Sequence, residues 1–348
     1  RATTPSLLVP IYRGAGRDPT FVVGGLLESA GTHARLGGSR TIIVEADESD
    51  ASFLHLQPMV AVVTNIDQDH MATYGHDFER LKSTFVEFVH RLPFYGTAIL
   101  CADDPVLTSL LPALSRPMFT YGFARDADYR ASDVQADGRS WRFRAHRPNG
   151  RGTLDVELAI PGRHNVLNAL AALAVAAEEG IDDGAVLRGL AGFSGVGRRF
   201  QVFENVSVGG VEVTLVDDYG HHPTEVRAVL DTVRRVWPGR RLVMTYQPHR
   251  YSRTRDLFDA FVEVLSEVDE LVLVEVYSAG EAPIPGADGR ALCCGIRKRA
   301  GIDPLFAANP ADALERLGGV VRDGDVVLVQ GAGNVSQVSN RLRGVANA

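Results

Sequence analysis

The spacing of apolar and polar residues in the first part of the chain predicts strands that alternate with helices. Two β-rich runs, 41–45 and 59–64, each end in polar residues, and we expect both to be buried parallel strands. Apolar residues then recur at helical spacing over 78–92, and 97–101 again has the pattern of a strand. This order predicts an α/β sheet whose ligands bind beyond the carboxyl ends of the strands.

The pattern changes twice before the middle of the chain. Short alternating segments over 129–160 predict antiparallel strands appended to the first sheet, and an alanine-rich helix should begin near Gly162, followed by a second short helix around 185–190. Three glycines lie within 192–197, and we place a domain boundary there, which gives domains 1–196 and 197–348. A hinge at these glycines would let the second domain close on the first.

A second α/β pattern begins directly after this boundary. Its strand-like runs alternate with helical stretches, as in a doubly wound, Rossmann-like sheet. These four runs are 211–216, 242–245, 271–275 and 326–329.

Composition narrows the class of protein. The 348 residues carry a net charge of −7, which argues against nucleic-acid binding through the overall field. The longest apolar stretch, 169–177, has about half the length of a membrane span, so we expect no membrane association. Cys101, Cys293 and Cys294 form neither a disulfide framework nor a metal motif and favour a reducing, cytoplasmic location.

Polar clusters follow the first two predicted strands. Four carboxylates lie within 45–50, and they could bind a hard divalent cation or simply form a solvated acidic turn. His70 follows the next strand, close to Asn65, Asp67 and Asp69. Imidazole and carboxylate together could hold Mg²⁺ or Mn²⁺ for phosphoryl transfer, although a lone histidine is more often structural.

Three further clusters follow strands of the second domain. Arginines and a histidine within 247–255 could hold a phosphate or a carboxylate at a helix start, or could be solvated arginines. The segment 217–223 could contact substrate or cap the next helix, where Pro223 fits the first position. Glycines within 330–334 could admit an anion to backbone amides, or could form a tight turn against the sheet.

Taken together and in this order, these segments resemble the Mur ligase family across essentially the whole chain. Within that family they are most similar to members that join L-alanine to UDP-N-acetylmuramate. The resemblance rests on 45–58, 64–71, 92–96, 162–168, 197–200, 217–225, 247–250 and 330–334.

The resemblance implies a central ATPase-like α/β domain followed by the Rossmann-like one. It also implies a reaction in which ATP phosphorylates the muramate carboxylate and the alanine amine attacks the acyl phosphate. By position, Glu45 and His70 correspond to ligands of Mg²⁺ or Mn²⁺, and Lys82 to a residue near the phosphates. The nucleotide contacts would be Asn65, His164, Asn168, Arg199, Asp217 and Tyr219. The alanine and the acyl phosphate would face His222, Arg250 and Arg253.

The chain departs from the family at its beginning. The family has an N-terminal UDP-sugar domain and a phosphate loop of the Gly-Thr-His-Gly-Lys-Thr type, whereas here Arg1 and Ala2 align with the loop lysine and threonine. We therefore expect this chain to lack the UDP-sugar domain and to have little activity alone. Two alternatives are a ligase that reattaches recycled muropeptides and a non-catalytic protein that keeps the scaffold and binds only a nucleotide or a partner.

Overall fold

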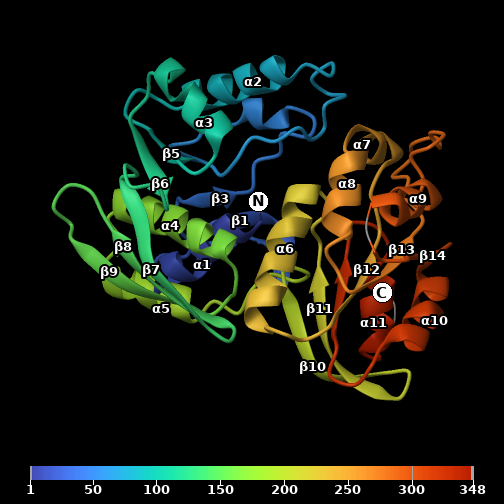
Figure 1. Ribbon diagram of the computed structural model, residues 1–348. Coiled ribbons are helices and arrows are strands. Elements are labelled where there is room, and N and C mark those ends of the chain that lie inside the picture. Colours follow the sequence, from blue (N-terminus) through green and yellow to red (C-terminus); the bar gives the residue numbers. More distant parts are fainter. Residues whose placement is uncertain (1, 300, 346–348) are drawn as a thin grey trace. The chain divides into compact units, whose positions relative to one another are not determined.

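The chain folds into two compact units, Arg1–Gly197 and Arg198–Ala348. The computed structural model describes residues 2–299 and 301–345. Each unit contains parallel strands with helices packed on them (Figure 1), so both are α/β, as the alternation of strand and helix patterns predicts.

The first unit contains two sheets. Their strand orders are β2-β1-β3 and β4-β5-β6-β7-β8-β9. In chain order the elements are α1 (Thr3–Gly14), β1 (Thr20–Leu27), β2 (Thr32–Arg35), β3 (Ile42–Val44), η1 (Ser52–His55), β4 (Val60–Val63), α2 (Phe78–His90), β5 (Thr97–Cys101), α3 (Pro105–Leu110), η2 (Leu111–Ala113), β6 (Met118–Gly122), β7 (Tyr129–Asp137), β8 (Ser140–His146), β9 (Thr153–Leu158), α4 (Arg163–Glu178) and α5 (Asp183–Ala191).

The larger of these sheets changes from parallel to antiparallel pairing along its width. Strands β4, β5, β6 and β7 pair in parallel, and β7-β8-β9 pair antiparallel. The prediction of antiparallel strands appended to the first sheet is confirmed. The alanine-rich helix α4 contacts β5, β6 and β7, and its small side chains are buried on several sides, which allows close approach to the sheet (Figure 1).

The expectation that 41–45 forms a buried strand is wrong. Strand β3 has only three residues, and Ile42 and Val44 are 60% and 38% exposed, while Ile43 is buried. A short β-branched run indicates a strand but cannot show whether one or both faces of it are covered. Strand β4 also alternates, with Ala61 and Val63 buried.

The second unit is built on one sheet with the order β10-β11-β15-β12-β13-β14. Strands β11 to β15 pair in parallel, and β10 joins the edge antiparallel to β11. The elements are β10 (Gln201–Val208), β11 (Val211–Asp218), α6 (Pro223–Val236), β12 (Leu242–Tyr246), α7 (Tyr251–Asp256), α8 (Phe258–Leu265), β13 (Glu270–Val274), α9 (Gly289–Arg299), β14 (Leu305–Ala307), α10 (Pro310–Val320), β15 (Val326–Gln330) and α11 (Ser336–Leu342).

Both faces of this sheet are buried. In β12, Met244 and Tyr246 belong to one apolar cluster and Val243 to another, so the alternating side chains of the strand pack on opposite layers of helices. The four strands predicted from the apolar runs are confirmed as β11, β12, β13 and β15. Strands β10 and β14 were not predicted, because they lie at the edges and carry weaker apolar patterns.

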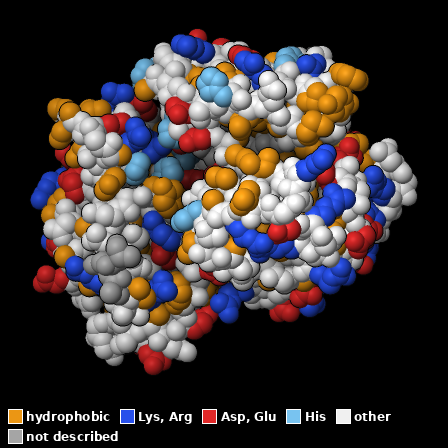
Figure 2. All heavy atoms as spheres, turned by 180° about the vertical axis from the view of Figure 1, so that it is seen from behind, with side chains coloured by type: hydrophobic (Ala, Val, Ile, Leu, Met, Phe, Trp, Pro, Cys, Tyr) orange, Lys and Arg blue, Asp and Glu red, His pale blue; other side chains and the backbone are white. Residues whose placement is uncertain are grey.

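The surface mixes charges of both signs with single or small groups of apolar side chains over the face that Figure 2 draws. Among the described helices, none combines the length and apolar character that crossing a membrane requires. The three cysteines are free, with Cys101 and Cys293 buried and Cys294 exposed.

Candidate functional site

In the first unit, the acidic segment after β3 lies against the loop that follows β4. The Thr73 hydroxyl donates to the Ser49 carbonyl at 2.6 Å, and the Tyr74 hydroxyl donates to the Glu48 carbonyl. Because β3 and β4 lie in different sheets, these contacts show how the two predicted clusters come together: through their loops rather than through strand pairing.

Glu45 is held by the neighbouring strand β1. The Gly24 amide donates to Glu45 Oε2 at 2.5 Å, and a Cβ atom at position 24 would lie 2.9 Å from the same oxygen. A side chain at position 24 would therefore displace the Glu45 carboxylate from this position. The aspartates of the same segment form local turns, since Asp47 accepts from the Ser49 amide and Asp50 from the Ser52 amide, both at 2.9 Å.

His70 has a left-handed backbone, with φ of +53°. Its Nε2 lies 3.4 Å from Asp69 Oδ2, and its amide donates to Asp69 Oδ1 at 2.8 Å, so the aspartate orients the imidazole. Asn65 accepts at 3.1 Å from the hydroxyl of Thr64.

Lys82 lies on α2 and has a local partner. Its Nζ is 2.5 Å from Glu79 Oε1 and 5.7 Å from the centre of the Phe78 ring. Glu79 is largely exposed, so the Lys82–Glu79 ion pair is not a buried structural contact.

The two predicted metal ligands both lie in this unit, in segments that contact each other. Glu45 offers a carboxylate and His70 an imidazole, which Mg²⁺ and Mn²⁺ accept when water and phosphate oxygens supply the remaining ligands. In the described part of the chain, no three histidine, cysteine or acidic side chains form a group that could hold a metal ion by themselves. The two-ligand metal site therefore stays a prediction.

A chain of side-chain hydrogen bonds connects α1 to the start of α4. The Thr4 hydroxyl donates to Asn168 Oδ1 at 2.9 Å, and Asn168 Nδ2 donates to Asn165 Oδ1 at 3.1 Å. Asn165 Nδ2 in turn donates to the Pro161 carbonyl at 2.6 Å. Asn168 thus fixes α1 against α4, and His164 lies half-buried on the first turn of the same helix.

In the second unit, two adjacent buried carboxylates end β11. Asp218 accepts from the Phe200 amide at 2.9 Å, the Gly220 amide at 2.7 Å and Gln330 Nε2 at 3.0 Å. Asp217 Oδ1 lies 3.3 Å from Arg198 Nε, and Asp217 is 1% exposed. Burial raises the pKa of both carboxyl groups, against the opposing effect of Arg198 on Asp217 and of Arg199 on Asp218. Asp217 therefore holds Arg198 in place.

Tyr219, the next residue, has arginines around its ring. The guanidinium carbons of Arg198 and Arg199 each lie 5.2 Å from the ring centre. Arg199 Nη1 is also 3.9 Å from Glu225 Oε1. The predicted nucleotide-side residues of this unit thus form one cluster with Arg198, which the sequence interpretation did not single out.

His222 caps helix α6. Its Nδ1 accepts from the Thr224 amide at 3.3 Å, while Glu225 Oε2 accepts from the amides of His221 at 2.9 Å and His222 at 3.1 Å. Burial opposes ionisation of Glu225, but His221, Arg199 and the two amides outweigh it and lower its pKa to about 2. Pro223 occupies the first position of α6, as predicted.

Arg250 and Arg253 follow β12 at the start of α7. Arg250 has a left-handed backbone with φ of +74°, and its amide donates to the Tyr277 carbonyl at 2.8 Å. Arg253 is buried and donates from Nη1 to the His249 carbonyl at 3.0 Å. The His249 ring stacks on Tyr277 with centres 5.4 Å apart. The loops after β12 and β13 therefore form one surface that carries Arg250.

The loop after β15 packs tightly against the same surface. Gln247 Nε2 donates to Asn334 Oδ1 at 2.8 Å, and Gln247 Oε1 accepts from the Val335 amide at 2.9 Å. A Cβ atom on Gly333 would lie 2.5 Å from Gln247 Oε1 and 2.6 Å from the Tyr277 side chain. This crowding favours the tight-turn interpretation of 330–334 over anion binding.

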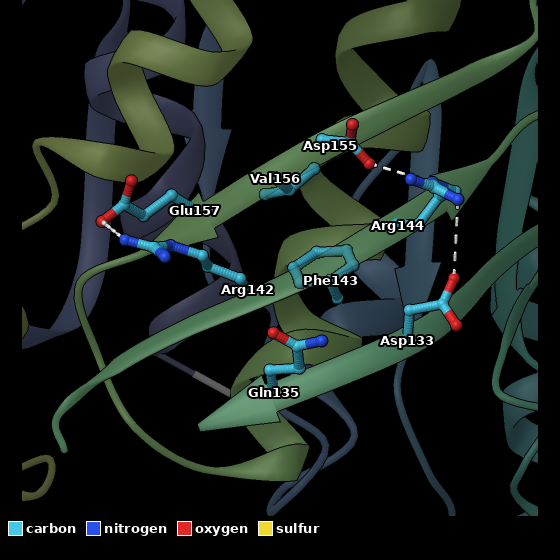
Figure 3. Close-up of a pocket in the computed structure, with 8 residues that line it drawn as sticks. All are labelled: Asp133, Gln135, Arg142, Phe143, Arg144, Asp155, Val156 and Glu157. Carbon is cyan, nitrogen blue, oxygen red and sulfur yellow. Dashed lines mark hydrogen bonds and ion pairs between the residues drawn. The ribbon is translucent and has the colours of Figure 1, made fainter. Parts of the chain in front are cut away.

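A concavity of about 310 Å³ on the face of β7-β8-β9 contains none of the predicted site residues (Figure 3). Arg144 lies there between Asp155, at 3.0 Å, and Asp133, at 3.8 Å. Arg142 faces Glu157 at 3.8 Å. Each arginine already has a carboxylate partner across the strands, which is the arrangement of a solvated sheet face. The remaining lining residues are Gln135, Phe143 and Val156.

Two models of known protein domains match the chain, one within each compact unit. Residues 27–176 match the model of the Mur ligase middle domain, and residues 198–333 match that of the Mur ligase, glutamate ligase domain. The chain belongs to the Mur ligase family. As a member of this family, the chain is an ATP-dependent acid–amino acid ligase. The polar clusters at the carboxyl ends of β11, β12 and β13 all lie within the second matched range.

Solved structures show how widely this fold is shared. The UDP-N-acetylmuramate-alanine ligase MurC from Thermotoga maritima is 26% identical, with 99% of this chain and 72% of that chain covered and a TM-score of 0.79. A murein peptide ligase from Psychrobacter arcticus is 22% identical, with 99% and 75% covered and a TM-score of 0.70. The MurF ligase from Thermotoga maritima, solved in complex with ADP, is 20% identical, with 98% and 77% covered and a TM-score of 0.74.

Several side chains that hold the loops of the second unit in place were not predicted from the sequence. Glu225 lies three residues after His222, the spacing of a capping box, so a local pattern could have revealed it. Gln247 and Glu281 have no such pattern, because their partners come from other loops.

Proposed function

We propose that this Mur ligase joins L-alanine to UDP-N-acetylmuramate, with ATP as the source of the activating phosphoryl group. The observation that carries the proposal is the 26% identity to the Thermotoga maritima alanine ligase over 99% of this chain. The motifs 45–58 and 217–225, which resemble alanine-adding members of the family, give further support.

In this proposal, the first unit binds the nucleotide and the cation. Glu45 and His70 would hold Mg²⁺ or Mn²⁺, which supplies positive charge that offsets the charge on the phosphates. Lys82 would add a point charge near them. The remaining proposed contacts of ATP in this unit are Asn65, His164 and Asn168.

The second unit would orient the amino acid and the activated acid. Arg250 and Arg253 would offer guanidinium groups to the alanine carboxylate and the acyl phosphate, and His222 would face the same substrates. The amine nitrogen attacks the acyl carbon, the C–N bond forms, the bond from that carbon to the phosphate oxygen breaks, and the amine loses a proton. Arg199 and Tyr219 would approach the nucleotide, and Asp217 would hold Arg198 beside them.

A second candidate substrate is a peptide rather than a free amino acid. The similarity to the Psychrobacter arcticus murein peptide ligase supports this alternative through the fold alone. It differs from the first proposal in what supplies the attacking amine: a tripeptide instead of L-alanine.

The test uses the chain joined to a UDP-sugar domain and a complete phosphate loop of the family's type. It measures phosphate release from ATP in the presence of Mg²⁺ and UDP-N-acetylmuramate, with L-alanine, glycine, L-serine or a muropeptide tripeptide as the amine. We expect L-alanine to give the highest kcat/KM, and Arg250→Ala to abolish that preference. Release that depends on the tripeptide and not on L-alanine would replace the proposal with the recycling reaction. ATP binding without release for any amine would support a non-catalytic protein instead.

A further inference from the structure

The loop after β13 returns to the start of α7. The Tyr277 amide donates to the Pro248 carbonyl at 2.9 Å, and the Glu281 amide donates to the Ser278 carbonyl at 3.0 Å. Ala279 and Gly280 both have positive φ, of +48° and +87°, so the chain turns sharply between them. This turn brings Glu281 to the residues that follow β12.

Glu281 then contacts two residues at the beginning of α7. Its Oε2 accepts from the Ser252 amide at 2.9 Å, and its Oε1 accepts from the Ser252 hydroxyl at 2.7 Å. Glu281 Oε1 also lies 3.6 Å from Arg250 Nη1. The Glu281 side chain is 24% exposed, whereas the Arg250 side chain is 42% exposed.

Arg250 has few other restraints on its side chain. It precedes α7 as the N-cap residue but makes no capping bond through its side chain. Its Nε is buried and has no hydrogen-bond partner. The direction of the guanidinium group is therefore set by its backbone, with φ of +74°, and by the carboxylate of Glu281.

We propose that Glu281 is a positioning residue that orients Arg250 toward the amino-acid substrate. This inference rests on the function proposed above, in which Arg250 binds the alanine carboxylate. The two Ser252 hydrogen bonds fix the Glu281 carboxylate, and the fixed negative charge holds one edge of the guanidinium group. The other donors of Arg250 stay available for a substrate carboxylate.

The alternative is that Glu281 only caps α7. Glu281→Gln separates the two roles, because one glutamine oxygen can accept from the Ser252 amide while the Ser252 hydroxyl reverses and accepts from the new amide group. The same amide group would face Arg250, and because both groups are hydrogen-bond donors they cannot bond to each other. Capping is thus largely kept, and the attraction to Arg250 is lost.

Glu275→Gln is the matched control. Glu275 lies at the start of the same loop, and its Oε1 accepts from the Val276 amide at 2.8 Å and the Gly289 amide at 3.0 Å. A glutamine oxygen can accept both bonds. We expect the two variants to have melting temperatures within about 3 °C of each other.

The first measurement is the ¹⁵N–¹H signal of Arg250 Nε in the whole chain, assigned by its loss in Arg250→Lys. We expect a resolved signal in the wild type and in Glu275→Gln. In Glu281→Gln it should move to the position of solvent-exposed arginines and exchange faster. An unchanged Arg250 signal in Glu281→Gln would overturn the proposal, whatever reaction the protein catalyses.

The second measurement is steady-state kinetics with L-alanine, for the wild type and the variants joined to the UDP-sugar domain and phosphate loop as in the test of the proposed function. We expect Glu281→Gln to raise KM for L-alanine roughly ten-fold, the effect of weakening one charge-assisted hydrogen bond, with kcat within about two-fold. A displaced Arg250 signal with an unchanged KM would refute the link to the amino acid. If the wild type uses no amine at all, the proposed function fails, while a displaced Arg250 signal would still support the positioning by Glu281.

Discussion

Asp218 should be the residue of the second unit whose replacement destabilises it most sharply. Its buried carboxylate accepts three hydrogen bonds, from the amides of Phe200 and Gly220 and from the side chain of Gln330. These donors come from the start of the unit, the loop before α6 and the end of β15. Asp218→Ala would leave all three without an acceptor in a space closed to solvent.

The expected cost follows from these three contacts. A buried donor that loses its acceptor costs about 1–3 kcal/mol, so three give roughly 3–9 kcal/mol before any relief. Removing a buried charge offsets part of this, because burial raises the pKa of Asp218 and so disfavours its ionised form. We expect Asp218→Ala to lower the free energy of unfolding by about 3–5 kcal/mol, and Asp218→Asn, which keeps one acceptor oxygen, by about 1–3 kcal/mol.

Denaturant unfolding, followed by Trp237 fluorescence, would measure the free energy of unfolding of these variants. Trp237 lies in the second unit and stacks on Phe200 with ring centres 6.2 Å apart. Trp141 lies in the first unit, so a Trp141→Phe background leaves Trp237 as the only tryptophan. Asp231→Asn, an exposed carboxylate on α6, serves as the control and should change stability by less than about 0.5 kcal/mol. If Asp218→Ala matched this control, the three hydrogen bonds would contribute nothing to the fold.

Two further predictions concern the proposed reaction, and a third concerns the stability of the fold at low pH. In the chain joined to a UDP-sugar domain and a complete phosphate loop, Glu45→Ala and His70→Ala should each abolish the metal-dependent step, with partial rescue at most by excess Mg²⁺ or Mn²⁺. Normal activity of both variants at low metal would exclude them as ligands. Arg253→Lys should lower kcat strongly with ATP affinity nearly unchanged, and equal losses in both would place Arg253 at the nucleotide instead. The Glu225 pKa falls from 4.5 to about 2 on folding, so its stabilising contribution is present above pH 4.5 and is lost as pH falls toward 2. Glu225→Gln should therefore reduce the acid dependence of unfolding, and an unaltered pH profile would contradict the shift.

The sequence by itself determined the four central strands of the second unit. The runs that became β12, β13 and β15 are nearly continuously apolar, because both faces of their sheet are covered by helices, whereas the run that became β11 begins with alternating residues. Pro223 marked the first turn of α6 for a local reason, since the helix start has no use for its missing amide. Such signals are carried by a few neighbouring residues and survive without knowledge of the fold.

The sequence did not predict the burial and packing of residues whose surroundings come from other parts of the chain. The run that contains β3 has the composition of a buried strand, yet Ile42 and Val44 are exposed, because nothing in the described chain covers that face of the strand. The glycines of 330–334 left an anion site and a tight turn both open, and the crowding of Gly333 against Gln247 became visible only in three dimensions. Burial depends on what packs against a residue, and composition alone does not contain that information.

Only the tertiary structure decided which clusters meet. Strand β15 is the last in the sequence, yet it lies between β11 and β12, and this places Gln330 beside Asp218, 112 residues away. In the same way, Glu281 reaches Ser252 across 29 residues through the turn after β13. The order of parallel strands is set by long-range pairing and by connections that cross the sheet, so residues at neighbouring strand ends are close in space without any pattern that links them along the chain.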